Sequence, residues 1–95
     1  MNKQKLQSCL PLVRRLARQH GAVRLRVFGS VARGDTTDHS DLDLLADFEP
    51  GRDLLDVAGL KVDLESALGC KVDIVEEAGL SPYIKGDVLK EAQPL

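Results

Sequence analysis

The stretch DLDLLADF, residues 41–48, constrains the fold of this chain more than any other part of its sequence. Apolar residues alternate with Asp41, Asp43 and Asp47, which is the period-two pattern of a strand with one apolar face. Successive side chains of a strand point to opposite faces, so Asp41 and Asp43 are expected on the same side. Two ionised carboxylates that close repel each other. The chain must therefore expose this face to water or hold a cation between the two acids.

Apolar periodicity along the rest of the chain predicts both helices and strands, so the fold class is α/β (α+β). Pro11 leaves the first turns of the first helix undefined. The last helix opens at Ser81-Pro82 and carries apolar residues as far as Ala92. The other predicted elements are a helix over 6–20, a strand over 24–28, a helical turn at 30–33, a strand over 41–48, a helix over 54–68 and a strand over 70–75.

Length and composition indicate one soluble domain that spans residues 1–95. Hydrophobic residues make up 43% of the 95 residues and charged residues 29%, as in globular chains. No apolar run is long enough to cross a membrane, and the start of the chain does not lead into a signal-peptide core. We therefore expect a cytoplasmic protein without a membrane partner. The net charge of −2 gives no reason to expect direct binding of nucleic acid.

Three arginines of the first predicted helix, Arg14, Arg15 and Arg18, fall on one side of it. They form either a solvated face or a surface for an acidic partner or a phosphate group. The two cysteines, Cys9 and Cys70, form no Cys-x-x-Cys motif and are expected to be small buried hydrophobic residues.

A third aspartate, Asp73, lies in the predicted strand over 70–75, between Val72 and Ile74. If this strand lies beside the strand over 41–48, Asp73 can share a face with Asp41 and Asp43. Magnesium takes oxygen ligands and typically binds carboxylates together with substrate phosphates. Three carboxylates on adjacent strands would thus form a magnesium site able to activate a hydroxyl or hold a phosphate.

The Gly29-Ser30 pair lies between the first predicted strand and the helical turn. Glycine permits close approach of the backbone, and amides at the start of a helical turn favour an anion such as phosphate. The Ser30 hydroxyl can add a hydrogen bond. Arg33 either contacts the same phosphates or forms an ion pair with Asp35 or Asp38.

The segment GSVARGDTTDHSDLDLL resembles the Gly-Ser-x10-Asp-x-Asp signature of the minimal nucleotidyltransferases, a polymerase-beta-like family. The segment KVDIV is similar to the strand that carries the third carboxylate of that family. The resemblance covers the chain from about Leu6 to Leu95. It implies a nucleotidyltransferase palm, with a small mixed β-sheet flanked by helices, that binds ATP and Mg²⁺. It further implies these site residues: Gly29, Ser30 and Arg33 for the nucleotide phosphates, and Asp41, Asp43 and Asp73 for metal and catalysis.

Many small members of this family resemble the antitoxin of MNT–HEPN toxin–antitoxin pairs, which transfers AMP from ATP to a tyrosine of its HEPN toxin. A chain of 95 residues has no room for a domain that holds the acceptor, which also favours a partner protein. We therefore expect a protein adenylyltransferase that acts as an antitoxin on a HEPN-type toxin. Two alternatives remain: a non-catalytic nucleotide-binding antitoxin that neutralises its partner by covering it, and a small-molecule nucleotidyltransferase.

Overall fold

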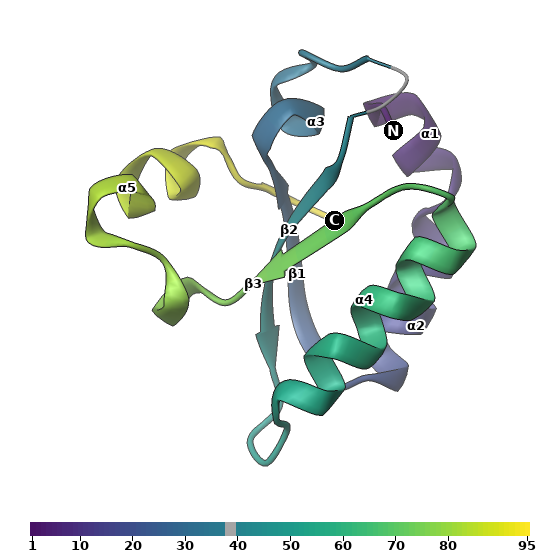
Figure 1. Ribbon diagram of the computed structural model, residues 1–95, viewed down its shortest axis with the longest axis vertical. Coiled ribbons are helices and arrows are strands. Elements are labelled where there is room, and N and C mark those ends of the chain that lie inside the picture. The colour runs from purple at the N-terminus through teal and green to yellow at the C-terminus, as the bar shows by residue number, and fades with distance from the viewer. Residues whose placement is uncertain (38–39) are drawn as a thin grey trace.

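A four-stranded mixed β-sheet with the order β3-β2-β1-β4 forms the centre of the computed structural model, which describes residues 1–37 and 40–95 (Figure 1). β1 pairs antiparallel with both β2 and β4, whereas β2 and β3 run parallel. The strands are β1 (Ala22–Phe28), β2 (Leu42–Phe48), β3 (Val72–Val75) and β4 (Gln93–Pro94). The mixed sheet that the family resemblance implies is thereby confirmed.

Helices α1, α2 and α4 lie on one side of the sheet, and α5 lies on the other (Figure 1). Among the described residues, no helix is both long and apolar enough to cross a bilayer. The helices are α1 (Lys3–Ser8), α2 (Leu10–Gln19), α3 (Gly29–Arg33), α4 (Leu54–Leu68), the short 3-10 helix η1 (Glu77–Gly79) and α5 (Pro82–Glu91).

The hydrophobic core fills the space between the sheet and the helices α1, α2 and α4. Its members on β2 are Leu42, Leu44 and Ala46, the apolar half of the alternating pattern. Fully buried residues from the other elements include Val13, Val31, Leu60, Leu64 and Val72. Burying a side chain of this size contributes about 1.5–3 kcal/mol, so the core fixes which face of β2 carries Asp43.

Three of the differences between the structure and the predicted elements have a clear physical reason. The helix expected over 6–20 is two helices that meet at Cys9, because Pro11 occupies the first turn of α2, where its missing N–H is tolerated. Leu45, which the period-two alternation places on the same face as Asp43 and Asp47, is buried, since η1 packs against β2. The edge strand β4 was not predicted, because it has only two residues and one is Pro94.

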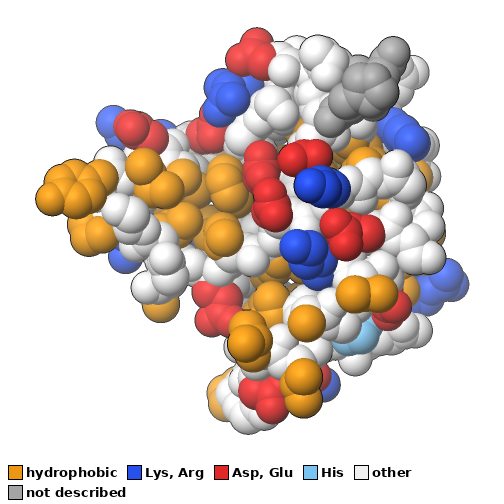
Figure 2. Space-filling model, in the orientation of Figure 1, with side chains coloured by type: hydrophobic (Ala, Val, Ile, Leu, Met, Phe, Trp, Pro, Cys, Tyr) orange, Lys and Arg blue, Asp and Glu red, His pale blue; other side chains and the backbone are white. Residues whose placement is uncertain are grey.

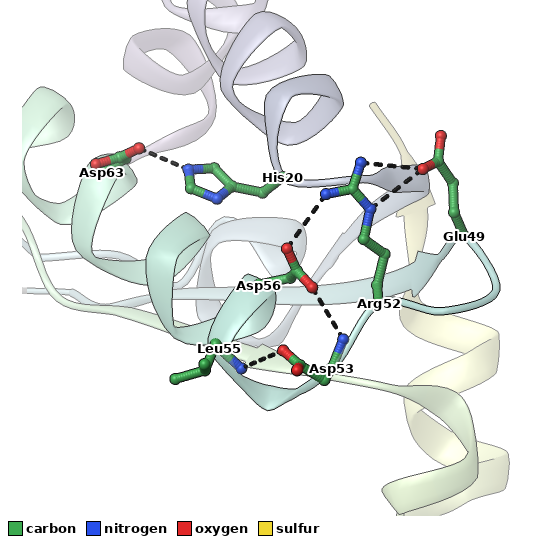
Figure 3. A network of polar contacts seen from close by, with 7 residues as sticks. All are labelled: His20, Glu49, Arg52, Asp53, Leu55, Asp56 and Asp63. Atoms are coloured by element: carbon green, nitrogen blue, oxygen red, sulfur yellow. Dashed lines mark hydrogen bonds and ion pairs between the residues drawn. The ribbon is translucent and has the colours of Figure 1, made fainter.

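Side-chain contacts hold the start of α4 and join this helix to α2 (Figure 3). Asp53 caps α4 by accepting a hydrogen bond from the amide of Leu55, and Asp56 accepts one from the amide of Asp53. His20, at the end of α2, lies 2.6 Å from the carboxylate of Asp63 on α4. The expectation that 54–68 is a helix is confirmed residue for residue, since the cap and the stop at Gly69 are both local signals.

Two surface features concern the charge and apolar patterns of the sequence. Arg14, Arg15 and Arg18 are exposed, and none forms an ion pair with another described residue; Arg14 and Arg18 line a hollow between α2 and the sheet. Hydrophobic side chains gather over α5 in the left part of Figure 2, where Tyr83 and Ile84 are exposed. Both cysteines are free and half-buried.

Candidate functional site

Three strands bring the predicted site residues together at one end of the sheet. In the parallel pair β2–β3, Asp43 stands opposite Asp73. In the antiparallel pair β1–β2, Asp43 stands opposite Phe28, the residue that directly precedes Gly29. The two aspartates and the glycine turn are therefore neighbours in the fold, although the chain separates them widely.

Asp41 lies just before β2 and is exposed, whereas Asp43 is half-buried and Asp73 is exposed. Within the part of the chain that the structure describes, no three acidic, histidine or cysteine side chains stand close enough to form a ready-made metal cage. The carboxylates nevertheless fit a magnesium ion in their chemistry, since all three offer the hard oxygen ligands that Mg²⁺ prefers. Like charges without a cation between them are expected to keep apart.

The electrostatics of Asp43 show how closely the acids are grouped. Burial raises the pKa of Asp43, and the negative charges of Asp73, Asp41 and Glu91 raise it further, while Arg33 opposes the shift. A bound cation would reverse this balance by favouring the ionised carboxylate. The surroundings of Asp43 thus favour a positive charge beside it.

Gly29 permits the backbone to turn directly beside Asp43. Its φ of +75° lies in the left-handed region, and a Cβ placed on it would overlap the carboxylate of Asp43. The Ser30 hydroxyl makes no hydrogen bond to any residue that the structure describes. A hydroxyl donor and the backbone of a glycine turn therefore lie next to the acids, the kind of groups that bind a phosphate.

Arg33 is held by two carboxylates. Its Nε lies 3.2 Å from Asp35 and its Nη1 lies 2.5 Å from Glu91. The ion pair expected with Asp35 is confirmed, and the other expected partner, Asp38, lies outside the described residues. Glu91 was missed in the sequence, because the residues it contacts lie about sixty positions earlier in the chain and no local pattern marks it.

The arrangement combines carboxylates, hydrogen-bond donors and an arginine at one end of the sheet. Such a site can bind the phosphates of a nucleotide together with a divalent cation and can accept a proton from an attacking hydroxyl. Among the described residues, His20 is engaged with Asp63 on α4. Direct transfer to an external acceptor is the chemistry that these residues suit best.

Comparison with known proteins agrees with this chemistry. The profile of the nucleotidyltransferase domain family matches residues 11–95. A solved structure described as a minimal nucleotidyltransferase is 55% identical, with a TM-score of 0.87, and the match covers 100% of this chain and 97% of the other. The protein adenylyltransferase MntA of Thermococcus cleftensis is 37% identical over 93% of this chain and 90% of its own. A mutant of the toxin–antitoxin MntA–HpeT has 26% identity and a TM-score of 0.73, over 90% of this chain and 70% of that one.

Proposed function

The chain belongs to the nucleotidyltransferase domain family, and we propose that it is a protein adenylyltransferase. It transfers AMP from ATP to a hydroxyl of a partner toxin of the HEPN type, and so acts as an antitoxin. The relative from Thermococcus cleftensis, which is named a protein adenylyltransferase, supports the reaction. The resemblance to MntA in a toxin–antitoxin structure supports the kind of partner.

One observation carries the proposal: Asp43 and Asp73 stand opposite each other on parallel strands, beside the Gly29 turn. Asp41, Asp43 and Asp73 would hold Mg²⁺, whose positive charge neutralises the nucleotide phosphates when it is bound. Gly29, Ser30 and Arg33 would bind those phosphates through the amide, the hydroxyl and the guanidinium. Asp73 is exposed, so an acceptor from outside the chain can approach it.

The reaction needs little covalent chemistry from the protein itself. The acceptor oxygen forms a bond to the α-phosphorus of ATP while the bond from that phosphorus to the bridging oxygen breaks, and pyrophosphate leaves. Asp73 would accept the proton of the acceptor hydroxyl. The residues of this chain act by holding the two reactants in line and by matching the charge of the phosphates.

The experiment is transfer of label from α-labelled ATP in the presence of magnesium and a lysate of the host. The wild type is compared with a double variant, Asp41→Asn with Asp43→Asn. A matched control, Glu76→Gln with Asp87→Asn, removes two exposed charges elsewhere on the surface. We expect a labelled protein band with the wild type and the control, and none with the site variant, while all three proteins stay folded.

Other outcomes identify other functions. If no protein is labelled although the wild type binds ATP, the chain is a covering antitoxin or a transferase for a small molecule. Loss of the fold in the site variant alone would show that the acids are structural and would contradict the enzymatic role.

A further inference from the structure

Glu91, the last residue of α5, contacts two groups of α3: the backbone amide of Gly29 and the guanidinium of Arg33. Its Oε2 accepts a hydrogen bond of 2.9 Å from the amide of Gly29, and its Oε1 lies 2.5 Å from Nη1 of Arg33. The Glu91 side chain is only 21% exposed, whereas that of Arg33 is 51% exposed. The carboxylate therefore lies inside the site, and the guanidinium approaches it from the solvent side.

The contacts of Glu91 are those that a phosphate group would make. A carboxylate and a phosphate both present negatively charged oxygens, and both are recognised by guanidinium and backbone N–H groups. Gly29 and Arg33 are two of the three residues expected to bind the nucleotide. Both are taken by Glu91, whereas the third donor, the Ser30 hydroxyl, has no partner among the described residues.

The position of Glu91 is also unfavourable to the acids beside it. Its charge acts on Asp43, which already stands opposite Asp73. Although burial opposes it, the Gly29 amide and the Arg33 guanidinium hold the pKa of Glu91 below its usual value, so the ionised carboxylate is stabilised where it lies and the cost falls on Asp43. If the carboxylate occupies the position of an anionic ligand, its repulsion of Asp43 acts only in the free protein. When the nucleotide binds, the carboxylate moves away and this repulsion ends.

We propose that Glu91 is an internal competitor of the nucleotide: its carboxylate occupies the phosphate position at Gly29 and Arg33, and it must turn away before ATP can bind. This inference rests on the proposed function, because it assumes that the site takes a nucleotide. We expect the Glu91 side chain, rather than the backbone, to move, since the backbone after it is held by the pairing of β4 with β1 and by the hydrogen bond from the amide of Leu95 to the carbonyl of Leu25.

The test is a titration with α,β-methylene-ATP and magnesium, followed by calorimetry, without any acceptor. This analogue cannot transfer AMP, so the experiment measures binding alone. Glu91→Gln removes the charge that pairs with Arg33, and Glu91→Asp keeps the charge but is too short for both contacts. Asp87→Asn, one turn earlier on α5 and exposed, is the matched control for charge.

We expect both Glu91 variants to bind the analogue about 3–10-fold more tightly than the wild type, because a larger fraction of molecules is ready to bind. The control should bind as the wild type does. Equal or weaker binding by Glu91→Gln would overturn the proposal and would make Glu91 a residue that positions Arg33. Tighter binding by Gln but not by Asp would also overturn it, since charge and not occupancy would then be the cause.

Failure of the proposed function looks different in the same experiment. If neither the wild type nor any variant binds the analogue, the site takes no nucleotide and the competitor role fails with it. If Glu91→Gln does not fold, Glu91→Asp and the control decide the outcome, because Asp preserves the charge next to Arg33.

Discussion

Two features of the structure require a glycine at position 29: its backbone conformation and the carboxylate of Asp43 beside it. Its positive φ would be strained in any residue with a Cβ, and a Cβ there would overlap the Asp43 carboxylate. Gly34 separates the two effects, since its φ is +81° but nothing lies within 4 Å of a Cβ placed on it. The two glycines thus form a natural pair for mutagenesis.

We expect Gly34→Ala to lower the free energy of unfolding by about 1–2 kcal/mol, the cost of a left-handed residue with a Cβ, while transfer of AMP is retained. Gly29→Ala should lose a similar amount of stability and also displace Asp43, so that transfer falls at least tenfold, by the rough scale of a misplaced catalytic group. Chemical denaturation and label transfer measure the two effects. Equal transfer by both variants would show that Asp43 tolerates the displacement.

The site residues that could be predicted from the sequence are those that belong to a short motif. The Gly-Ser pair and the Asp-x-Asp pair are close in the chain, and the structure places both at one end of the sheet. Glu91 could not be predicted, because an acid in the last turn of a helix has no special pattern and its contacts depend on how α5 returns to β1. Two predictions therefore stay untested: catalysis and metal binding by the three aspartates, and binding of the nucleotide by Gly29, Ser30 and Arg33.

At the scale of elements, α4 contains a glycine in its middle, which would ordinarily weaken a helix by about 1 kcal/mol relative to alanine. The structure gives the reason for Gly59. A Cβ there would lie 2.8 Å from Cε1 of the His20 ring, which is held by its contact with Asp63. A glycine at position 59 therefore lowers the helix propensity of α4 but permits close packing of α2 against it.

Gly86 in α5 provides the comparison, because a Cβ at this position would meet nothing within 4 Å. We expect Gly86→Ala to raise the free energy of unfolding by about 0.5–1 kcal/mol, as for an unhindered helical glycine. Gly59→Ala should instead lower it by about 1–3 kcal/mol, since the ring must shift. Urea denaturation of both variants measures this. A stabilising Gly59→Ala would show that His20 can move aside at little cost.

The elements that the sequence predicted well are those with local signals at both ends. α4 has a capping box and a C-terminal glycine, and its bounds were predicted correctly. β4 could not be predicted, because two residues that include a proline become a strand only when β1 offers an edge to pair with. Pro11 left the first turns of the first predicted helix undefined, but it did not predict the break between α1 and α2 at Cys9.

At the scale of the whole molecule, the ionised carboxylate of Asp43 lowers the free energy of unfolding. The folded state raises the pKa of Asp43 above its usual value through burial and through the charges of Asp73, Asp41 and Glu91. A raised pKa means that the stability present at low pH, where Asp43 is protonated, is lost as the pH rises through the folded-state pKa. An asparagine at this position cannot ionise and escapes this loss.

We therefore expect Asp43→Asn, without metal or nucleotide, to be more stable than the wild type at pH 7 by on the order of 0.5 kcal/mol, the scale of cross-strand pairs. Below the usual pKa of an aspartate, the advantage should vanish. Urea denaturation of the two proteins, at pH 7 and below the usual pKa of an aspartate, measures this difference in the free energy of unfolding. At pH 7 high salt should make the difference smaller, because salt screens the repulsion between the carboxylates. An advantage that is the same at every pH would contradict this assignment of charge.

The family and the fold class were predictable from the sequence, because the signature and the alternating pattern lie in continuous segments. The nucleotidyltransferase class is confirmed by the match over residues 11–95. The parallel pairing of β2 with β3 was only conditional in the sequence, since no local pattern says which strands become neighbours. This pairing is what makes Asp43 and Asp73 one site.

The same pairing also sets an order of events during translation. The two partners of the acid pair are separated in the chain by the whole of α4, and at about 5–20 residues per second a ribosome needs roughly 2–6 s to pass from one to the other. Glu91 follows later still. A nascent chain released only as far as α4 already carries the glycine turn and its two nearby acids, but it has no complete site. Asp73 and Glu91 therefore join Asp43 and the glycine turn only after α4 has been synthesised.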